Sequence, residues 1–159
     1  AREHIRCEWH ELSDYTLKNL PQDAVVLSTG DPMLSGLGRF ASRNDTIIPG
    51  ISSLQLACAR LRIEFGSVSV VNAHARDIQD AKELMLRELG AGKIVFMLPD
   101  AIFGAVEAAG FLRSKGLRYR IAVLENLSYA DERIEIGDAE KPPAARNGMY
   151  CMVIGDFEP

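Results

Sequence analysis

The chain has 159 residues, of which 47% are hydrophobic, so it is long enough to bury a core as one domain or two small ones. Its net charge is −4 with scattered lysines and arginines, which argues against nucleic acid as a partner. It has no apolar run of about 18 residues, no signal-peptide pattern and only three distant cysteines, so we expect a cytoplasmic protein without membrane spans or disulfides.

The first part of the chain alternates short β-forming runs with loops rich in Gly, Pro and small polar residues. Hydrophobic spacing and capping residues predict helices at residues 13–20, 35–42 and 54–61, and strands at residues 24–27 and 45–48. The loops after the two strands carry Ser28-Thr29-Gly30-Asp31-Pro32 and Pro49-Gly50-Ile51-Ser52-Ser53. Because open α/β sheets bind ligands beyond the carboxyl ends of their strands, these two loops are candidate binding loops.

The pattern restarts near residue 64 and becomes richer in strands. It predicts strands at residues 67–71, 93–98, 120–124, 133–136 and 149–154, and helices at residues 77–89 and 99–114. The order begins as βαβαβ and ends in antiparallel strands. We therefore predict an α/β fold of two domains, with a parallel sheet in residues 1–63 and a mixed sheet with helices in residues 64–159.

Each candidate binding loop has a structural interpretation beside the functional one. Gly30 permits a positive φ and a close ligand approach, and Asp31 offers an acceptor, but Gly, Asp and Pro are also common in ordinary turns. Ser52 and Ser53 present hydroxyls at a helix start, which suits either ligand binding or simple helix capping. Both interpretations stay open for each loop.

Polar groups also follow the strands of the second part. His74 with Arg76 suits anion binding or proton transfer, while a surface histidine before a helix cap at Asp77 explains the pattern equally well. Glu125-Asn126-Leu127 follows a strand and is a further candidate for ligand contact. These residues form a second set of candidate site groups.

Two other patterns are weaker. Gly36-Leu37-Gly38-Arg39-Phe40-Ala41 fits a loose dinucleotide motif with Glu64 as the ribose acid, but its glycines do not directly follow the strand. His4, Cys7 and His10 are spaced by three residues without a fourth ligand nearby, so we predict no metal site.

Four stretches together resemble the tetrapyrrole methylases. They are Ser28-Thr29-Gly30-Asp31-Pro32, Pro49-Gly50-Ile51-Ser52-Ser53-Leu54-Gln55-Leu56-Ala57, Asn72-Ala73-His74-Ala75-Arg76-Asp77, and Leu124-Glu125-Asn126-Leu127 with Glu132-Arg133. The Gly-Asp-Pro loop is common to the superfamily. The Pro-Gly-x-Ser-Ser-x-Gln-x-Ala run and the His-x-Arg-Asp loop favour the branch that methylates C5 of precorrin-6Y or cobalt-precorrin-7 in cobalamin biosynthesis.

The resemblance implies two α/β domains with S-adenosylmethionine between them and the tetrapyrrole in an adjoining cleft. By position it implies cofactor contacts from Gly30, Asp31, Leu34, Ser52, Ser53, Leu98, Asn126, Leu127 and Met149. The acceptor would be a precorrin or cobalt-precorrin, with its carboxylates met by Arg76 or Arg39. A homodimer is usual in the family, and a C15-methylating decarboxylase is a further partner to consider.

The chain departs from the family pattern in two places. Where this branch usually has His-Gly-Arg, the chain has His74-Ala75-Arg76. Family members also begin with a strand and a Gly-x-Gly-Pro-Gly loop, which these 159 residues do not contain. We therefore expect an N-terminally truncated chain whose first sheet exposes apolar edges.

Methyl transfer from a sulfonium to an electron-rich meso carbon is a direct displacement. We expect a site that aligns donor and acceptor and excludes water, without a protein nucleophile or a metal. If a base assists, His74 is the first candidate and Asp31 the second. Two other classes stay open: a nicotinamide-dinucleotide-dependent oxidoreductase domain, and an inactive fragment or partner-binding module of a methylase.

Overall fold

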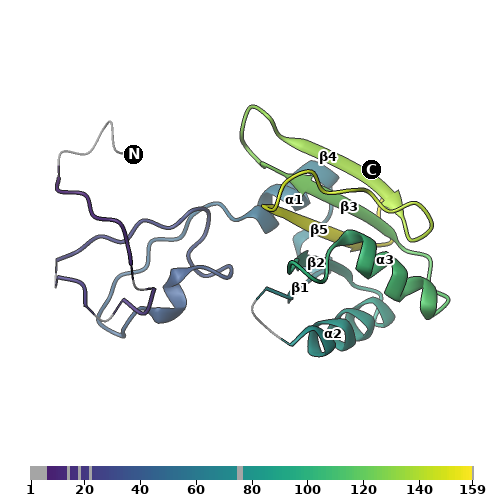
Figure 1. Cartoon of the computed structure of the whole chain (residues 1–159), viewed down its shortest axis with the longest axis horizontal. Helices are drawn as coiled ribbons and strands as arrows, with labels where there is room; N and C mark the ends of the chain where they lie inside the picture. The colour runs from purple at the N-terminus through teal and green to yellow at the C-terminus, as the bar shows by residue number, and fades with distance from the viewer. Residues whose placement is uncertain (1–6, 14, 18, 22, 75–76, 159) are drawn as a thin grey trace. The chain divides into compact units, whose positions relative to one another are not determined.

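The computed structural model describes residues 7–13, 15–17, 19–21, 23–74 and 77–158. These residues divide into two compact units, Ala1–Gly50 and Ile51–Pro159, and each is described by itself (Figure 1). The division falls before the helix α1 (Ser53–Leu61), so α1 is part of the second unit. The boundary predicted between residues 63 and 64 lies on the other side of this helix.

A five-stranded mixed sheet forms the centre of the second unit, in the order β1-β2-β5-β3-β4. Its strands are β1 (Val68–Asn72), β2 (Ile94–Leu98), β3 (Arg120–Glu125), β4 (Arg133–Asp138) and β5 (Tyr150–Gly155). β1 and β2 are parallel, β5 lies antiparallel between β2 and β3, and β4 pairs antiparallel with β3. The predicted mixed sheet with a βαβαβ start is confirmed.

The helices α2 (Ile78–Gly90) and α3 (Ala105–Ser114) pack on one face of this sheet (Figure 1). Strand residues alternate between faces, and those that face the two helices form one core cluster with them. Its larger members are Phe103, Met85, Leu89, Leu112, Val71, Val95, Met97, Ile121, Val123, Met152 and Ile154. The alternate residues Phe96, Leu124, Cys151 and Val153 are also buried, so both faces of the central strands are covered.

The helix starts follow from capping side chains. Asp77 caps α2 by accepting a hydrogen bond from the Gln79 N–H at 2.7 Å, as predicted. The predicted helix start at residue 99 is wrong. Asp100 and Phe103 form an isolated β-bridge, and α3 begins only after Gly104. Of the described helices, none combines the length and the apolar character that crossing a bilayer requires.

The first unit contains less regular structure than its sequence predicts. Within its described residues the one helix is the 3₁₀ turn η1 (Leu37–Phe40), and the strands predicted at residues 24–27 and 45–48 are absent. The helix predicted at residues 13–20 is absent from the described residues, which exclude 14 and 18. The helix predicted at residues 35–42 is reduced to η1. A strand forms only when neighbouring backbone completes its hydrogen bonds, and these runs lack such a neighbour among the described residues. Val25 and Ile48 are accordingly 83% and 79% exposed.

Candidate functional site

Several predicted site residues meet at one edge of the second unit's sheet. Asn72 pairs with Leu98, and Glu125 pairs with Tyr150, so the ends of β1, β2 and β3 and the start of β5 share this edge. It carries His74 after β1, Leu98 at the end of β2, Asn126 and Leu127 after β3, and Met149 before β5. Five predicted site residues from four separate stretches of sequence therefore lie along one sheet edge.

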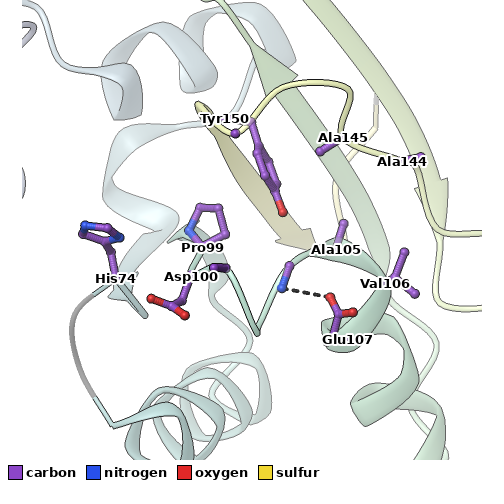
Figure 2. Close-up of a pocket in the computed structure, with 12 residues that line it drawn as sticks. His74, Pro99, Asp100, Ala105, Val106, Glu107, Ala144, Ala145 and Tyr150 are labelled. Carbon is purple, nitrogen blue, oxygen red and sulfur yellow. Dashed lines mark hydrogen bonds between the residues drawn. The ribbon is translucent and has the colours of Figure 1, made fainter.

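A pocket of about 480 Å³ opens at this edge, on the side of α3 (Figure 2). Its polar side chains are His74, Asp100, Glu107 and Tyr150. The other lining residues are small or apolar, namely Pro99, Ala101, Gly104, Ala105, Val106, Ala144, Ala145 and Gly148. Of the predicted site residues, His74 alone is among the described residues that line this pocket.

The pocket is acidic. Asp100 Oδ1 accepts from the Ile102 N–H at 3.2 Å. Glu107 Oε2 accepts from the Gly104 N–H at 3.0 Å (Figure 2). No lysine or arginine is among the described residues that line it. Two carboxylates without a lining cation make the pocket favourable for cationic or hydroxyl-bearing ligands and unfavourable for polycarboxylates.

Tyr150 is a pocket residue that the sequence analysis missed. Burial raises the pKa of its phenol, and the negative charges of Glu107 and Glu125 raise it further. The hydrogen bond that the Ala105 N–H donates to the phenol lowers the pKa, but the net shift is upward. The phenol is therefore neutral near pH 7 and able to donate a hydrogen bond. A Cβ at Gly104 would lie 2.5 Å from the Tyr150 hydroxyl, which explains the glycine there. In the sequence, the three-residue spacing from Gly104 to Glu107 is that of a capping box, and it could have located the helix start that faces Tyr150.

Glu125 points into the protein instead of toward the pocket. Its side chain is 1% exposed, and its carboxylate accepts from Arg133 Nη1 at 2.5 Å and from the backbone N–H groups of Arg146 and Asn147 at 2.6 and 2.8 Å. Burial alone would raise its pKa, but these hydrogen bonds and the charge of Arg133 together lower it below its usual range. Glu125 is thus an ionised, fully paired internal group.

The turn that carries Asn126 and Leu127 is held in an uncommon conformation. Asn126 and Ser128 have φ values of 50° and 72°, which non-glycine residues rarely adopt. Asn126 Nδ2 donates to Asp131 at 2.7 Å, and the Ser128 N–H donates to Glu132 at 2.7 Å. Such backbone strain persists only where neighbouring groups hold it, and it is concentrated at functional sites.

Glu132 joins this turn to α1. Arg60 of α1 donates to both Glu132 oxygens, at 2.6 Å from Nε and 3.1 Å from Nη2. The Arg60 hydrogen bond, followed by that from the Ser128 N–H, lowers the pKa of Glu132. One carboxylate therefore fixes the Asn126–Leu127 turn and the helix that begins at Ser53.

Ser52 is the N-cap of α1. Its hydroxyl accepts from the Gln55 N–H at 3.1 Å, and its own N–H donates to Gln55 Oε1 at 2.8 Å, so both halves of a capping box are present. The capping interpretation of Ser52 is confirmed. Cofactor contact by Ser52 or Ser53 stays a prediction.

We expect Ser52→Ala to reduce the free energy of unfolding of the second unit by about 1 kcal/mol, because the cap of α1 is lost. Urea unfolding followed by circular dichroism measures this change. Ser53→Ala is the matched control, since it leaves the capping box intact. Equal stability of Ser52→Ala and the parent chain would contradict a capping role.

Within the first unit, Asp31 joins the two candidate binding loops. Its carboxylate accepts from the Met33 N–H at 2.7 Å and from the Gly50 N–H at 3.3 Å. Gly30 has a φ of 70°, and a Cβ at Gly50 would overlap the Gly30 carbonyl oxygen. The glycines and the aspartate thus have a local structural role in bringing the loops together. Leu34 lies in the same turn, with its N–H bound to the Asp31 carbonyl oxygen at 3.2 Å.

We expect Gly50→Ala to push the two loops apart and lower the local free energy of opening by about 1–3 kcal/mol, because a methyl group overpacks this contact. Limited proteolysis across residues 28–50 measures the opening. Gly66→Ala is the control, since a Cβ there meets nothing within 4 Å. Unchanged cleavage in Gly50→Ala would show that the loops are not held together by this contact.

Predictions for Arg39, Arg76, His4 and the loose dinucleotide motif remain. Arg39 is exposed, with its guanidinium 4.6 Å from the centre of the Phe40 ring. Arg76 and His4 lie outside the described residues. The glycines of the loose dinucleotide motif lead into η1, a four-residue 3₁₀ turn, instead of the strand–turn–α-helix that dinucleotide binding requires.

Comparison with known proteins gives consistent relatives. The family described as Tetrapyrrole (Corrin/Porphyrin) Methylases matches residues 3–143. The chain is 34% identical over 134 residues to the cobalt-precorrin-7 C(5)-methyltransferase of Salmonella typhimurium, covering 80% of this chain and 62% of that protein. It is also 34% identical over 147 residues to a probable cobalt-precorrin-7 C(5)-methyltransferase of Methanocaldococcus jannaschii, covering 84% and 66%.

A solved structure agrees with these relatives. The structure described as cobalamin biosynthesis precorrin-6Y methylase from Archaeoglobus fulgidus is 30% identical, with a TM-score of 0.53, and the match covers 82% of this chain and 60% of that one. The chain therefore spans about three fifths to two thirds of the length of the relatives that it matches.

Proposed function

The chain belongs to the tetrapyrrole methylases, and from this membership we propose that its protein transfers a methyl group from S-adenosylmethionine to the C5 meso carbon of a precorrin or cobalt-precorrin. The observation that carries the proposal is the sheet edge at which His74, Leu98, Asn126, Leu127 and Met149 meet. The names of the relatives supply the acceptor and the position that is methylated.

The acidic pocket supports S-adenosylmethionine as the donor. The donor brings an electrophilic methyl group on a positively charged sulfur, together with an ammonium group, a single carboxylate and ribose hydroxyls, so its net charge is positive. Asp100 and Glu107 are suited to such groups by charge and as hydrogen-bond acceptors. A tetrapyrrole periphery with many carboxylates would be repelled by the same two side chains. We therefore assign the pocket to the donor and not to the acceptor.

In this proposal the protein acts by holding, orienting and shielding. The Asn126–Leu127 turn, fixed by Asp131 and Glu132, offers a rigid wall at the sheet edge. His74 lines the pocket and is the first candidate for a proton acceptor, with Asp31 as the second. Arg39 and Arg76 are proposed to meet acceptor carboxylates. A homodimer, a C15-methylating decarboxylase as a partner and a cytoplasmic location belong to the same proposal.

A thermal-shift experiment on the full-length protein tests the donor. At 100 times its dissociation constant, S-adenosylmethionine or its demethylated product should stabilise the protein by about 2.7 kcal/mol. Nicotinamide dinucleotides serve as the control ligands, since the oxidoreductase alternative predicts that they stabilise it instead. If neither ligand raises the melting temperature, an inactive or partner-binding module is favoured. Mass and NMR analysis of the product then identifies the methylated carbon.

A further inference from the structure

We propose that Glu125 is a positioning residue that holds the loop of residues 144–148 in place as a wall of the donor pocket. Its effect on methyl transfer rests on the proposed function, whereas its hold on the loop does not. Glu125 is not among the residues that line the pocket, so it acts through the loop and not by touching a ligand.

The loop is bound by one ion pair, in which Glu125 is buried and Arg133 is partly exposed. Glu125 Oε1 accepts from the N–H groups of Arg146 and Asn147 at 2.6 and 2.8 Å. Its other oxygen binds Arg133 Nη1, which also donates to the Ala144 carbonyl oxygen at 3.1 Å. The carboxylate therefore fixes two loop donors, and its guanidinium partner fixes a loop acceptor.

The same loop supplies three of the pocket's lining residues, Ala144, Ala145 and Gly148 (Figure 2). Its residues from 144 to 148 are exposed, so apolar burial contributes little to their placement. Backbone hydrogen bonds to Glu125 and Arg133 are then the main restraint on this wall. Charge-assisted hydrogen bonds of this kind are stronger and more directional than neutral ones.

The pairing of β3 with β5 places Glu125, which holds the loop, opposite Tyr150, whose phenol lines the pocket. Glu125 of β3 pairs with Tyr150 of β5, which lies two residues beyond the end of the loop. Tyr150 lines the pocket and accepts a hydrogen bond from the Ala105 N–H at the start of α3. One strand end thus sets both the loop and the tyrosine that closes the pocket beside it.

Amide hydrogen exchange of Glu125→Gln tests the hold on the loop without any ligand. A glutamine directs an NH₂ group at Arg133 or at the loop N–H groups, so exchange at Arg146 and Asn147 should accelerate about tenfold or more. Amides of the β3–β5 ladder should keep their protection. The matched control is Glu135→Gln, because Glu135 also pairs with Arg133 but makes no bond to the loop.

Donor affinity and turnover of the full-length protein test the consequence. Glu125→Gln should raise the dissociation constant of S-adenosylmethionine about tenfold, with kcat at saturating donor within about twofold of the parent enzyme. Glu125→Asp, which keeps the charge but is shorter by one methylene, should show the same exchange increase and serves if the glutamine variant does not fold.

The outcomes separate the two proposals. Unchanged exchange at Arg146 and Asn147 overturns the positioning role, and so does faster exchange across the whole β3–β5 ladder, which indicates only general stability. Faster loop exchange with unchanged donor affinity shows that the loop is not a wall of the donor site. If the parent protein does not bind S-adenosylmethionine, the proposed function is wrong. Amide exchange at Arg146 and Asn147 still tests the role of Glu125 in that case.

Discussion

Replacing Arg133 by alanine should lower the free energy of unfolding of the second unit by about 3–5 kcal/mol, the usual effect of leaving a buried charge without its partner. Glu125 is 1% exposed, and Arg133 is its one charged partner among the described residues. Without the guanidinium, the carboxylate either remains as an unpaired buried charge or takes up a proton. Urea unfolding of the parent chain and of Arg133→Ala at pH 7 measures the difference.

The pH dependence identifies the cause of this loss. Because the folded-state pKa of Glu125 is lowered, its contribution to stability is complete above the pKa of the unfolded glutamate and is lost as the pH falls through the folded pKa. The parent chain should therefore lose stability in acid, and its advantage over Arg133→Ala should shrink there. Arg118→Ala is the control, since that side chain is 82% exposed and should change little. An equal difference at pH 3 and pH 7 would indicate lost packing rather than lost charge.

The elements of the second unit could be predicted because their patterns are local. The strand runs at residues 67–71, 93–98 and 149–154 are apolar and bounded by turn residues, and α2 begins at the Asp77 cap. The start of α3 was wrong, since Pro99 suits a first helical turn but Asp100 binds the Ile102 N–H and bends the chain. The turn formed by Asp100, and not the helix-start preference of Pro99, determines where α3 begins.

The site was predictable as a set of loops but not as a cavity. Strand ends could be identified from hydrophobic runs, and this located His74 and the Asn126–Leu127 turn. The pocket itself depends on Gly104 and Tyr150, which are distant in sequence and meet only because β5 inserts between β2 and β3. Glu125 was considered as a ligand contact, and only its burial and the fold of residues 144–148 give it an internal role.

Replacing His74 by alanine should reduce kcat of the full-length enzyme about 10²–10⁴-fold if its imidazole accepts the proton released after methyl transfer. His74 lines the pocket proposed for the donor together with Asp100, and its own backbone N–H donates to the Asn72 side chain at 3.0 Å. That hydrogen bond does not involve the imidazole, so the substitution should leave the loop backbone in place. Steady-state kinetics with saturating donor and acceptor measure the loss.

A second variant distinguishes proton transfer from ligand contact at this position. His74→Gln keeps a hydrogen-bonding side chain of similar reach but cannot take up a proton near neutral pH. If His74 is the base, both variants should lose the same large factor in kcat. If the histidine only contacts a ligand, the glutamine variant should recover most of the rate, and the alanine variant should raise KM more than it lowers kcat. Turnover at the parent rate by His74→Ala would remove both roles and leave alignment of donor and acceptor as the whole contribution of this edge.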